Sequence, residues 1–403
     1  MKTATTMAGP QDRAAQDVAR SDVTFVNCTA DTFSPTAGAA ISIWLWEVCQ
    51  AARRAGVEPM VISKESSAEA FPWPRTISVP FPDRSKNPIV HFVSRAQKKL
   101  GGWRYLRQRR YVIRVAEAIK EAGMQSSCVV LHNDPEAAIY LRRLLPRARI
   151  MLIFHNSDAG MRSAFRGDLS RDVDVVMAVS SAAARAIEHA YALPEGTVKA
   201  IYNGVDLEQF HPAEQPKSDL PIINFTGRLR PDKSPDIVLK AAVVLSESTR
   251  DFAIQLLGTS QLQEGQIDDY ERGIRELIKT LELRGIDVRL TGHVDRRRIA
   301  EEVRKASIHV TPSRKQEEFG LATIEGMASG LATVASKTGG TPEVVGDAGF
   351  LFDSESITQL AEQLKALVLD QELRATYGQK ARQRAEQFTW DRTWARLMEL
   401  ASA

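Results

Sequence analysis

Short apolar runs alternate with helical patterns in two successive series, and this alternation is the feature that most constrains the fold of the chain. The first series has runs of the length of buried strands, at residues 23–28, 59–63, 128–132, 150–155 and 174–180. Helical periods lie between several of them, for example at residues 41–55 and 113–122. Such an order predicts right-handed βαβ units and a parallel sheet covered by helices on both faces.

The second series follows a polar, proline-containing stretch that is typical of a domain linker. Its predicted strands are residues 222–227, 252–258, 288–292, 308–312, 331–336 and 349–352, and helical periods at 357–369, 371–387 and 393–401 close the chain. Open α/β sheets bind ligands outside the carboxyl ends of their strands. We therefore predict an α/β protein with two Rossmann-like lobes that face each other across a cleft.

These patterns also set the expected domain boundaries. A length of 403 residues is too great for one ordinary core and comfortable for two. We expect a disordered leader at residues 1–20, an N-terminal Rossmann-like domain at 21–205, a linker at 206–220, a C-terminal Rossmann-like domain at 221–385 and a final helix at 386–403 that packs back on the N-terminal domain.

Composition excludes some classes of protein and site. The three cysteines, Cys28, Cys49 and Cys128, are odd in number and form no Cys-x-x-Cys pair, which argues against a disulfide framework or a zinc site and favours a reducing, cytoplasmic compartment. A net charge of +3 identifies no partner. The longest apolar run, residues 39–48, is too short to span a bilayer and contains Glu47.

Two glutamates, Glu317 and Glu325, flank a predicted turn from a strand into a helix at Gly320. Backbone N–H groups at the start of a helix can hold a phosphate, and carboxylates beside a phosphate need hydroxyl partners such as those of a sugar or a ribose. The small neighbours Ala322 and Ser329 are expected to leave Glu325 open to a ligand. By spacing alone, solvated loop charges and a helix residue favoured by the dipole explain the pair equally well.

Two more predicted loops carry residues suited to a phosphate ligand. Gly227 follows a buried strand. After it, Arg228 provides a planar guanidinium group and Lys233 an ammonium group, and the two cations together suit a diphosphate. Gly339 and Gly340 follow another buried strand at the same edge of the predicted sheet. The alternatives are a basic surface loop and a plain turn.

These elements occur in the order of a known family. The motifs are Asn203-Gly204-Val205-Asp206, Gly227-Arg228-Leu229 with Lys233, Pro312-Ser313, Glu317-x-Phe319-Gly320-Leu321 with Glu325-Gly326-Met327-Ala328-x-Gly330, and Gly339-Gly340-x-Pro342-Glu343. In this order they resemble the retaining glycosyltransferases of family four (glycosyl transferases group 1), which have the GT-B fold of two Rossmann domains. The resemblance is strong over residues 202–353 and looser over 23–181. It implies C-terminal helices that cross back to the first lobe.

The resemblance implies a nucleoside-diphosphate sugar, UDP- or GDP-linked, as the donor, with no cofactor and no metal. Glu317 would contact hydroxyls of the donor sugar, and Glu325 those of the ribose. Arg228 and Lys233 would hold the diphosphate and stabilise its charge as it leaves. Further donor contacts are implied for Gly38, Gly258, His293, Val294, Phe319, Gly320, Leu321, Ala322 and Thr323, of which Gly258, His293 and Val294 would lie near the base.

On the acceptor side the match is less complete. The family usually has two adjacent glycines where this chain has Ala37 and Gly38, so tight backbone approach at Ala37 is in doubt. His155 matches a family histidine beside the donor sugar, and we favour a catalytic role for it over a structural one. His132 and Asn133 also follow a predicted strand and are expected to shape the acceptor site.

The sequence Asp172-Val173-Asp174 looks like the D-x-D metal motif of other glycosyltransferases. We interpret it otherwise, because Asp174 opens a predicted strand on which alternate residues make no open site. The resemblance likewise points to a fold in which cations and helix dipoles replace a metal.

A basic region extends from Arg84 to Lys120, where Glu117 is the only acid and Trp103, Tyr105 and Tyr111 are interleaved. Its cations are Arg84, Lys86, Arg95, Lys98, Lys99, Arg104, Arg107, Arg109, Arg110, Arg114 and Lys120. A basic amphipathic segment with aromatics suits an anionic membrane surface, here the inner face of the plasma membrane. The alternative is a solvated helix that grips an anionic acceptor. No base-stacking motif supports binding of nucleic acid.

The sequence thus predicts an enzyme, a retaining and metal-independent hexosyltransferase. It would move a hexose from a nucleoside-diphosphate sugar to a hydroxyl of a glycan or glycolipid acceptor, in the synthesis of surface polysaccharide or lipopolysaccharide. The alternatives are a GT-B sugar-nucleotide epimerase and a non-catalytic nucleotide-sugar-binding protein.

Overall fold

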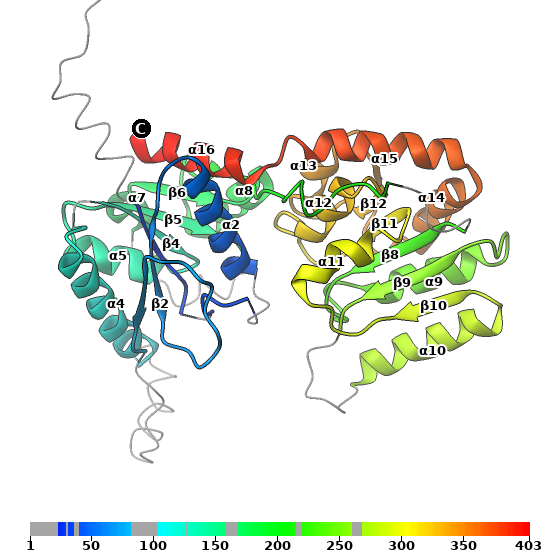
Figure 1. Ribbon diagram of the computed structural model, residues 1–403, viewed down its shortest axis with the longest axis horizontal. Helices are drawn as coiled ribbons and strands as arrows, with labels where there is room; N and C mark the ends of the chain where they lie inside the picture. The colour runs from blue at the N-terminus through cyan, green and yellow to red at the C-terminus, as the bar shows by residue number, and fades with distance from the viewer. Residues whose placement is uncertain are drawn as a thin grey trace, which may run out of the picture. The chain divides into compact units, whose positions relative to one another are not determined.

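The computed structural model describes residues 23–29, 31–35, 40–81, 103–125, 127–157, 168–214, 220–259 and 268–403, with the backbone alone for residues 103–108 and for Arg297. Contacts divide these residues into two units (Figure 1). The first extends to Ile201 and also includes Trp390–Ala403, and the second is Tyr202–Thr389. Residues 202–214, which include the start of the predicted linker, therefore belong to the second unit.

The first unit is built on a parallel sheet with the strand order β3-β2-β1-β4-β5-β6-β7. Its strands are β1 (Val23–Val26), β2 (Met60–Lys64), β3 (Thr76–Val79), β4 (Cys128–His132), β5 (Arg149–Phe154), β6 (Val175–Ala178) and β7 (Lys199–Ala200). The five predicted strands are all present. The two that the sequence pattern missed, β3 and β7, lie at the edges and are only partly buried, so they lack an apolar run.

Six helices are described in the first unit. They are α2 (Ala40–Arg54), α4 (Trp103–Glu121), α5 (Pro135–Leu144), α7 (Leu169–Asp172), α8 (Ser181–Tyr191) and α16 (Trp390–Ser402). Of these, α4, α5 and α8 contact the sheet. The side chains of Asp134 and Ser180 accept hydrogen bonds from the first turns of α5 and α8, which fixes where these helices begin. The predicted helix at 113–122 is the second half of α4, which begins at Trp103.

The last helix, α16, packs against α2 within the first unit. Nε of Arg54 donates to Asp391 at 2.9 Å, and Nη2 of Arg149 donates to the carbonyl of Leu400 at 3.3 Å. Trp394 and Leu397 are buried on the packed face. The chain therefore leaves the first unit after Ile201 and returns to it at Trp390.

The second unit contains another parallel sheet, with the order β10-β9-β8-β11-β12-β13. Its strands are β8 (Ile222–Thr226), β9 (Ala253–Leu257), β10 (Asp287–Leu290), β11 (Ile308–Thr311), β12 (Ala332–Ser336) and β13 (Phe350–Phe352). Its helices are α9 (Pro235–Leu245), α10 (Asp269–Leu283), α11 (Arg296–Val303), α12 (Leu321–Ala328), α13 (Thr341–Val345), α14 (Ile357–Leu369) and α15 (Gln371–Ala385). Both units are Rossmann-like, which confirms the prediction of an α/β protein with two Rossmann-like lobes.

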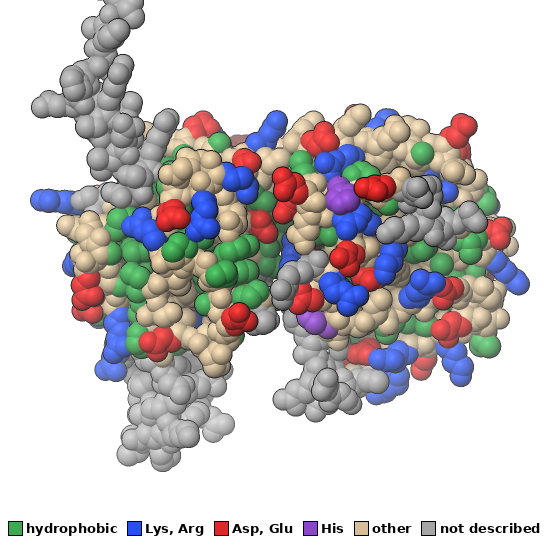
Figure 2. All heavy atoms as spheres, viewed as in Figure 1, with side chains coloured by type: hydrophobic (Ala, Val, Ile, Leu, Met, Phe, Trp, Pro, Cys, Tyr) green, Lys and Arg blue, Asp and Glu red, His purple; other side chains and the backbone are tan. Residues whose placement is uncertain are grey.

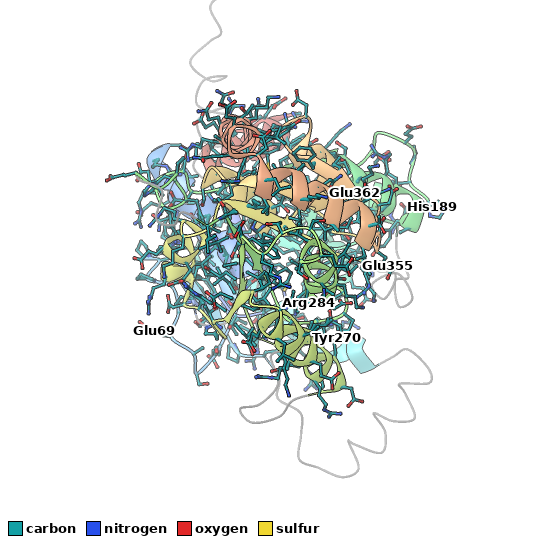
Figure 3. All side chains as sticks on the ribbon, turned by 90° about the vertical axis from the view of Figure 1, so that its right-hand side faces the viewer. Glu69, His189, Tyr270, Arg284, Glu355 and Glu362 are labelled. Carbon is teal, nitrogen blue, oxygen red and sulfur yellow. The ribbon has the colours of Figure 1, made fainter. Side chains whose placement is uncertain are left out.

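Helix α9 lies between α10 and α14, and their apolar side chains form one core with the sheet. Tyr270 and Arg284, near the two ends of α10, tie this helix to α9 (Figure 3). Oη of Tyr270 donates to Asp236 at 2.6 Å, and Nη1 of Arg284 donates to the carbonyl of Val243 at 2.9 Å. Helices α9 and α10 are thus joined near both of their ends.

Several sequence-based predictions fall on residues that the structure does not describe. The leader at 1–20 lies outside the described residues, as do Arg84, Lys86, Arg95, Lys98 and Lys99 of the basic region. Within the described parts of the chain, no helix is both long enough and apolar enough to cross a bilayer. On the face drawn in Figure 2, basic and acidic side chains are interspersed over the second unit.

Candidate donor-binding site

Three loops of the second unit leave neighbouring strands at their carboxyl ends. Strands β8, β11 and β12 are adjacent in the sheet, and they lead into residues 227–234, 312–320 and 337–340. Because carboxyl ends of parallel strands share one edge, the three loops meet there. The structure thereby brings together the three sequence elements that were singled out for a phosphate-containing ligand.

Lys233 and Glu317 form the centre of this edge. Nζ of Lys233 lies 2.5 Å from Oε2 of Glu317, and Oγ of Ser313 donates to the same oxygen at 2.9 Å. The two side chains are 30% and 16% exposed, so the pair is reachable from solvent. Ser313 had been noted only as part of a motif and not as a site residue.

The glycine loop after β12 packs directly on the backbone of Glu317. The N–H of Gly340 donates to the carbonyl of Glu317 at 2.8 Å. A Cβ at Gly339 would lie 2.2 Å from that carbonyl oxygen, and φ of Gly339 is +53°. Residue 339 must therefore be glycine for this loop to set the position of Glu317.

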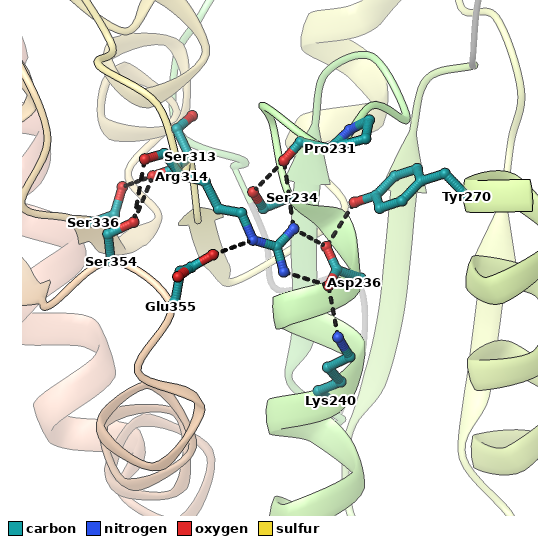
Figure 4. Close-up of polar contacts among 10 residues, drawn as sticks. All are labelled: Pro231, Ser234, Asp236, Lys240, Tyr270, Ser313, Arg314, Ser336, Ser354 and Glu355. Carbon is teal, nitrogen blue, oxygen red and sulfur yellow. Dashed lines mark hydrogen bonds and ion pairs between the residues drawn. The ribbon is translucent and has the colours of Figure 1, made fainter.

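A charged network anchors the loop that carries Glu317 (Figure 4). Nη1 and Nη2 of Arg314 donate to the two oxygens of Asp236 at 2.8 and 2.7 Å, and Nε donates to Glu355 at 2.7 Å. Lys240 and Tyr270 also donate to Asp236. Burial opposes ionisation of Asp236, but hydrogen bonds from Arg314, Lys240 and Tyr270 hold its pKa well below the usual range. Sequence analysis missed this network, because its members belong to no shared motif.

Arg228 and its neighbours follow β8. The Arg228 side chain is exposed, whereas Leu229 is buried. A Cβ at Gly258 would lie 1.9 Å from the carbonyl oxygen of Gly227, so the ends of β8 and β9 meet backbone to backbone. Residue 258 must therefore be a glycine for the two strand ends to pack. Its contact with the base of the nucleotide remains a prediction.

The two other residues predicted near the base lie beside Gly258. Gly258 and Gly292 form an isolated antiparallel bridge, and His293 and Val294 follow directly. His293 is exposed, and Val294 packs on a small apolar cluster with Leu257 and Val303.

Helix α12 begins without a side-chain cap. Gly320 is its N-cap residue, with φ of +91°, and it has no side chain that could accept hydrogen bonds from the helix. The N–H groups of residues 321–323, at the start of the helix, therefore receive no cap from this residue. Leu321 and Ala322 are partly exposed, while Phe319 is buried against Tyr202 and Phe388.

Buried hydroxyls and a histidine fix α12 on the sheet. The hydroxyls of Thr323 and Thr311 lie 2.9 Å apart, and His309 contacts Thr311 at 3.2 Å and Asn224 at 3.0 Å. A Cβ at Gly326 would lie 2.5 Å from the His309 ring. The start of the helix is therefore held at a fixed distance from β11.

Glu325 corrects one sequence-based expectation. It is 4% exposed, whereas its small neighbours on α12 predicted an open carboxylate. The reason is Arg296 at the start of α11, whose Nη1 lies 2.5 Å from Oε1 of Glu325 and whose guanidinium stands over the Phe210 ring at 5.4 Å. Burial raises the pKa of Glu325, and the charge of Arg296 opposes that rise.

The contact between Arg296 and Glu325 leaves hydrogen-bonding capacity unused. Nη1 of Arg296 and Oε1 of Glu325 are 2.5 Å apart, whereas Nε of Arg296 is buried without a hydrogen-bond partner. Buried polar atoms of this kind are normally satisfied by protein, water or a ligand. Arg296 was not among the predicted site residues.

The predicted acceptor-side residues belong to the first unit. His132 ends β4 and His155 follows β5, and Nδ1 of His132 lies 2.9 Å from Nε2 of His155. Asn133 has φ of +53°, and its Oδ1 accepts from the N–H of His155 at 2.7 Å. Ala37 and Gly38 lie outside the described residues.

Asp172 and Asp174 are both paired with arginines. Asp172 accepts from Arg171, and Asp174 accepts from Arg142 and from the N–H of Ile150. Over the parts of the chain that the structure describes, no three His, Cys, Asp or Glu side chains gather as a metal site would require.

Three buried histidines make an acid-dependent contribution to stability. Burial lowers the pKa of His155 to about 3 and that of His309 to about 4, and burial together with the charge of His155 lowers the pKa of His132. The unfolded chain takes up these protons below its ordinary pKa of about 6.5, and the folded chain does not. We expect the free energy of unfolding to fall below pH 6.5, by about 1.4 kcal/mol per pH unit for each histidine that stays neutral.

Calorimetric unfolding between pH 7.5 and 5 checks this expectation. The variant His155→Asn should show a shallower loss of stability with falling pH, whereas His189→Asn, at an exposed histidine (Figure 3), should match the unmodified chain. An unchanged slope in His155→Asn would contradict a neutral buried His155.

Two family models match successive parts of the chain. The model described as Glycosyltransferase Family 4 matches residues 41–209, and that described as Glycosyl transferases group 1 matches residues 206–384. The chain belongs to the group 1 glycosyl transferases. The second match includes all three loops of the candidate site.

Curated relatives of this group 1 glycosyl transferase agree with that assignment. Spore coat protein SA of Bacillus subtilis (strain 168) is 26% identical over 339 residues, which are 79% of this chain and 86% of the relative. A D-inositol 3-phosphate glycosyltransferase of Streptomyces avermitilis is 31% identical over 233 residues, or 54% of this chain and 49% of the relative. This chain thus spans about half the length of that second relative.

Solved structures show that this group 1 glycosyl transferase has the GT-B fold. A glycosyltransferase from Rickettsia africae ESF-5 superimposes with a TM-score of 0.71 at 19% identity, over 95% of this chain and 98% of the other. Anabaena Alr3699/HepE in complex with UDP superimposes with a TM-score of 0.72 at 18% identity, over 94% and 99%.

Proposed function

We propose that this group 1 glycosyl transferase moves a hexose, with retention and without a metal, from a UDP- or GDP-linked sugar to a hydroxyl of a glycan or glycolipid. The observation that carries the proposal is the pairing of Lys233 with Glu317 beside the uncapped start of α12. It places a cation and helix N–H groups, which suit a diphosphate, next to a carboxylate, which suits sugar hydroxyls.

Each residue has a distinct task in this proposal. Lys233, Arg228 and the N–H groups of residues 321–323 would neutralise the diphosphate as negative charge develops on it. Glu317 would accept hydrogen bonds from the sugar hydroxyls and so orient the ring. Its backbone is held by Gly340 and its loop by Arg314, which favours a preorganised site.

Glu325 and Arg296 would hold the ribose. A ribose hydroxyl can accept a hydrogen bond, so it would satisfy the buried Nε of Arg296, while Oε1 of Glu325 keeps its ion pair with Nη1. The neighbour Anabaena Alr3699/HepE has been solved with UDP and with UDP-glucose, which supports a nucleotide sugar as the donor of this chain as well.

Retention requires that the acceptor oxygen replace the diphosphate on the same face of the sugar. In the proposed step the bond between the anomeric carbon and the diphosphate oxygen breaks, and the acceptor oxygen bonds to that carbon. The proton of the acceptor hydroxyl passes to the departing phosphate oxygen. The step therefore needs no enzymic nucleophile, and neither Glu317 nor Glu325 acts as one.

The proposed setting is the synthesis of a cell-surface glycan at the cytoplasmic face of a membrane. Relatives and neighbours include spore coat protein SA and a lipopolysaccharide outer core galactosyltransferase, which support a surface product. Contact with an anionic membrane through the region from Arg84 to Lys120 remains part of the proposal. Within the described part of that region, Arg109 stands against the Tyr140 ring at 5.0 Å.

A donor panel tests the proposal. UDP- and GDP-linked hexoses are incubated with the full chain in EDTA, with and without glycan and glycolipid acceptors, and nucleoside diphosphate release is measured. We expect release with one donor that rises with acceptor and is insensitive to EDTA. Donor conversion without acceptor would identify an epimerase, and binding without release a non-catalytic protein. Failure of every donor to bind would refute the proposed function.

Two variants in the same panel test the ribose assignment. Glu325→Gln removes the carboxylate that faces Arg296, and we expect its Kd for the nucleoside diphosphate to rise about tenfold, the loss of one charge-assisted hydrogen bond. Glu318→Gln is the matched control, because Glu318 bonds to Gln316 of its own loop. Equal affinity in Glu325→Gln and Glu318→Gln would remove the ribose role.

A further inference from the structure

Two histidines from neighbouring strands share a hydrogen bond inside the first unit. The atoms are Nδ1 of His132 and Nε2 of His155, 2.9 Å apart, and the rings are stacked with centroids 5.1 Å apart. Trp44 of α2 meets both rings edge-on, with centroids at 5.0 and 5.4 Å. Both histidines are buried, at 0% and 8% exposure, so the hydrogen bond is shielded from water.

The remaining nitrogen of His132 decides which way this hydrogen bond runs. Nε2 of His132 is buried and has no hydrogen-bond partner. A neutral imidazole carries one hydrogen, on either Nδ1 or Nε2. Orphaned buried N–H donors are rarer in proteins than under-satisfied acceptors, so the hydrogen of His132 belongs on Nδ1. His132 then donates, and Nε2 of His155 accepts.

The same bond fixes the hydrogen of His155. With Nε2 engaged as an acceptor, a neutral His155 carries its hydrogen on Nδ1. Burial lowers the pKa of both histidines, which keeps them neutral at physiological pH. The backbone of His155 is held separately, because its N–H donates to Asn133 at 2.7 Å. Adjacent residues at the end of β4 thus fix both the backbone and the ring of His155.

We propose that His132 is a positioning residue that holds His155 as its Nδ1–H tautomer, so that His155 offers a hydrogen-bond donor to a hydroxyl oxygen of the acceptor. This inference rests on the proposed function, since His155 acts only if the chain is a transferase. It reassigns His132, which the sequence pattern placed on the acceptor side. Nδ1 of His132 serves His155, and its Nε2 is buried without a hydrogen-bond partner, so we assign the side chain no direct contact with a ligand.

The tautomer is measured directly in the full chain. Two-bond ¹H–¹⁵N correlation spectra of ¹⁵N-histidine-labelled protein distinguish Nδ1–H from Nε2–H imidazoles without any substrate. We expect both His132 and His155 to be neutral Nδ1–H tautomers at pH 7. An Nε2–H signal for His155 would overturn the proposal, whatever the enzymatic activity of the chain.

A pair of substitutions separates positioning from packing. His132→Asn keeps an amide N–H close to the position of Nδ1, whereas His132→Leu keeps the volume and removes the donor. We expect His132→Asn to retain the Nδ1–H tautomer of His155 and kcat within about threefold. His132→Leu should shift the tautomer and lower kcat about ten- to a hundredfold with little change in KM, as expected for a lost donor.

The outcomes divide clearly. Equal kinetic losses in His132→Asn and His132→Leu would show that His132 merely fills space and would overturn the proposal. The proposal would also be overturned if His132→Leu shifted the tautomer of His155 and left kcat unchanged. If no donor sugar is turned over at all, the proposed function fails, and the spectra of the unmodified chain still report whether His132 sets the tautomer of His155.

Discussion

The variant Lys233→Met is expected to lower kcat about a thousandfold while the protein stays folded. Nζ of Lys233 lies 2.5 Å from Glu317, at the edge where the diphosphate would leave. Its loss removes a positioned cation from the developing charge and leaves Glu317 without its ion-pair partner, and a single such donor is worth about 10²–10³ in kcat. The cost in stability should be small, about 1 kcal/mol or less, because the Lys233 side chain is 30% exposed. Steady-state diphosphate release with the productive donor, together with thermal unfolding, measures both quantities.

The matched control for this variant is Lys305→Met. Lys305 also pairs with a carboxylate, at 2.6 Å from Glu302, but it follows α11 and belongs to none of the three site loops. Its kcat should stay within about twofold of the unmodified chain. A kcat of Lys233→Met within threefold of the unmodified value would exclude a role in catalysis. In the double variant with Glu317→Gln, the losses should be less than additive, because the two side chains act as a pair.

The variant Gly339→Ala should lose both stability and activity. Its Cβ would lie 2.2 Å from the carbonyl oxygen of Glu317, and its backbone has φ of +53°. Strain and overpacking together are expected to cost about 3 kcal/mol. Relief of the clash would move Glu317, and a displacement of about 1 Å at a catalytic group costs about a hundredfold in rate. Calorimetry and kcat/KM for the donor give the two effects.

Gly285→Ala is the control for Gly339→Ala. Gly285 also has positive φ, at +84°, but no atom lies within 4 Å of a Cβ built there. It should lose only about 1 kcal/mol from backbone strain, with kcat/KM unchanged. Similar kcat/KM values for the two variants would mean that the contact with Glu317 has no catalytic consequence.

The sequence predicted the central strands of both sheets because buried parallel strands are apolar throughout. It missed β3 and β7, since edge strands that are partly exposed have no continuous apolar run. Lys233, Glu317 and the glycine loop were also predicted as neighbours, because each follows a buried strand at the same edge of one sheet. Local patterns thus predict residues whose position depends on the strand immediately before them.

Interactions between distant segments could not be predicted in the same way. Arg314 meets Asp236 across 78 residues, and neither stands in a motif. Glu325 was expected to be open, because only its neighbours on α12 are visible in the sequence, whereas Arg296 comes from α11. His132 and His155 were each noted, but their pairing depends on the register of β4 with β5, in which His132 aligns with Ile153.

The return of α16 to the first unit has a consequence for how the protein is made. The first unit lacks the helix that packs on α2 until the ribosome has passed residues 202–389, which make up the whole second unit. At typical elongation rates of 5–20 residues per second, this takes about 10–40 s. During that interval the second unit can fold on its own, while the apolar face of α2 remains exposed to chaperones. The first unit can therefore complete its fold only after the whole second unit has been synthesised.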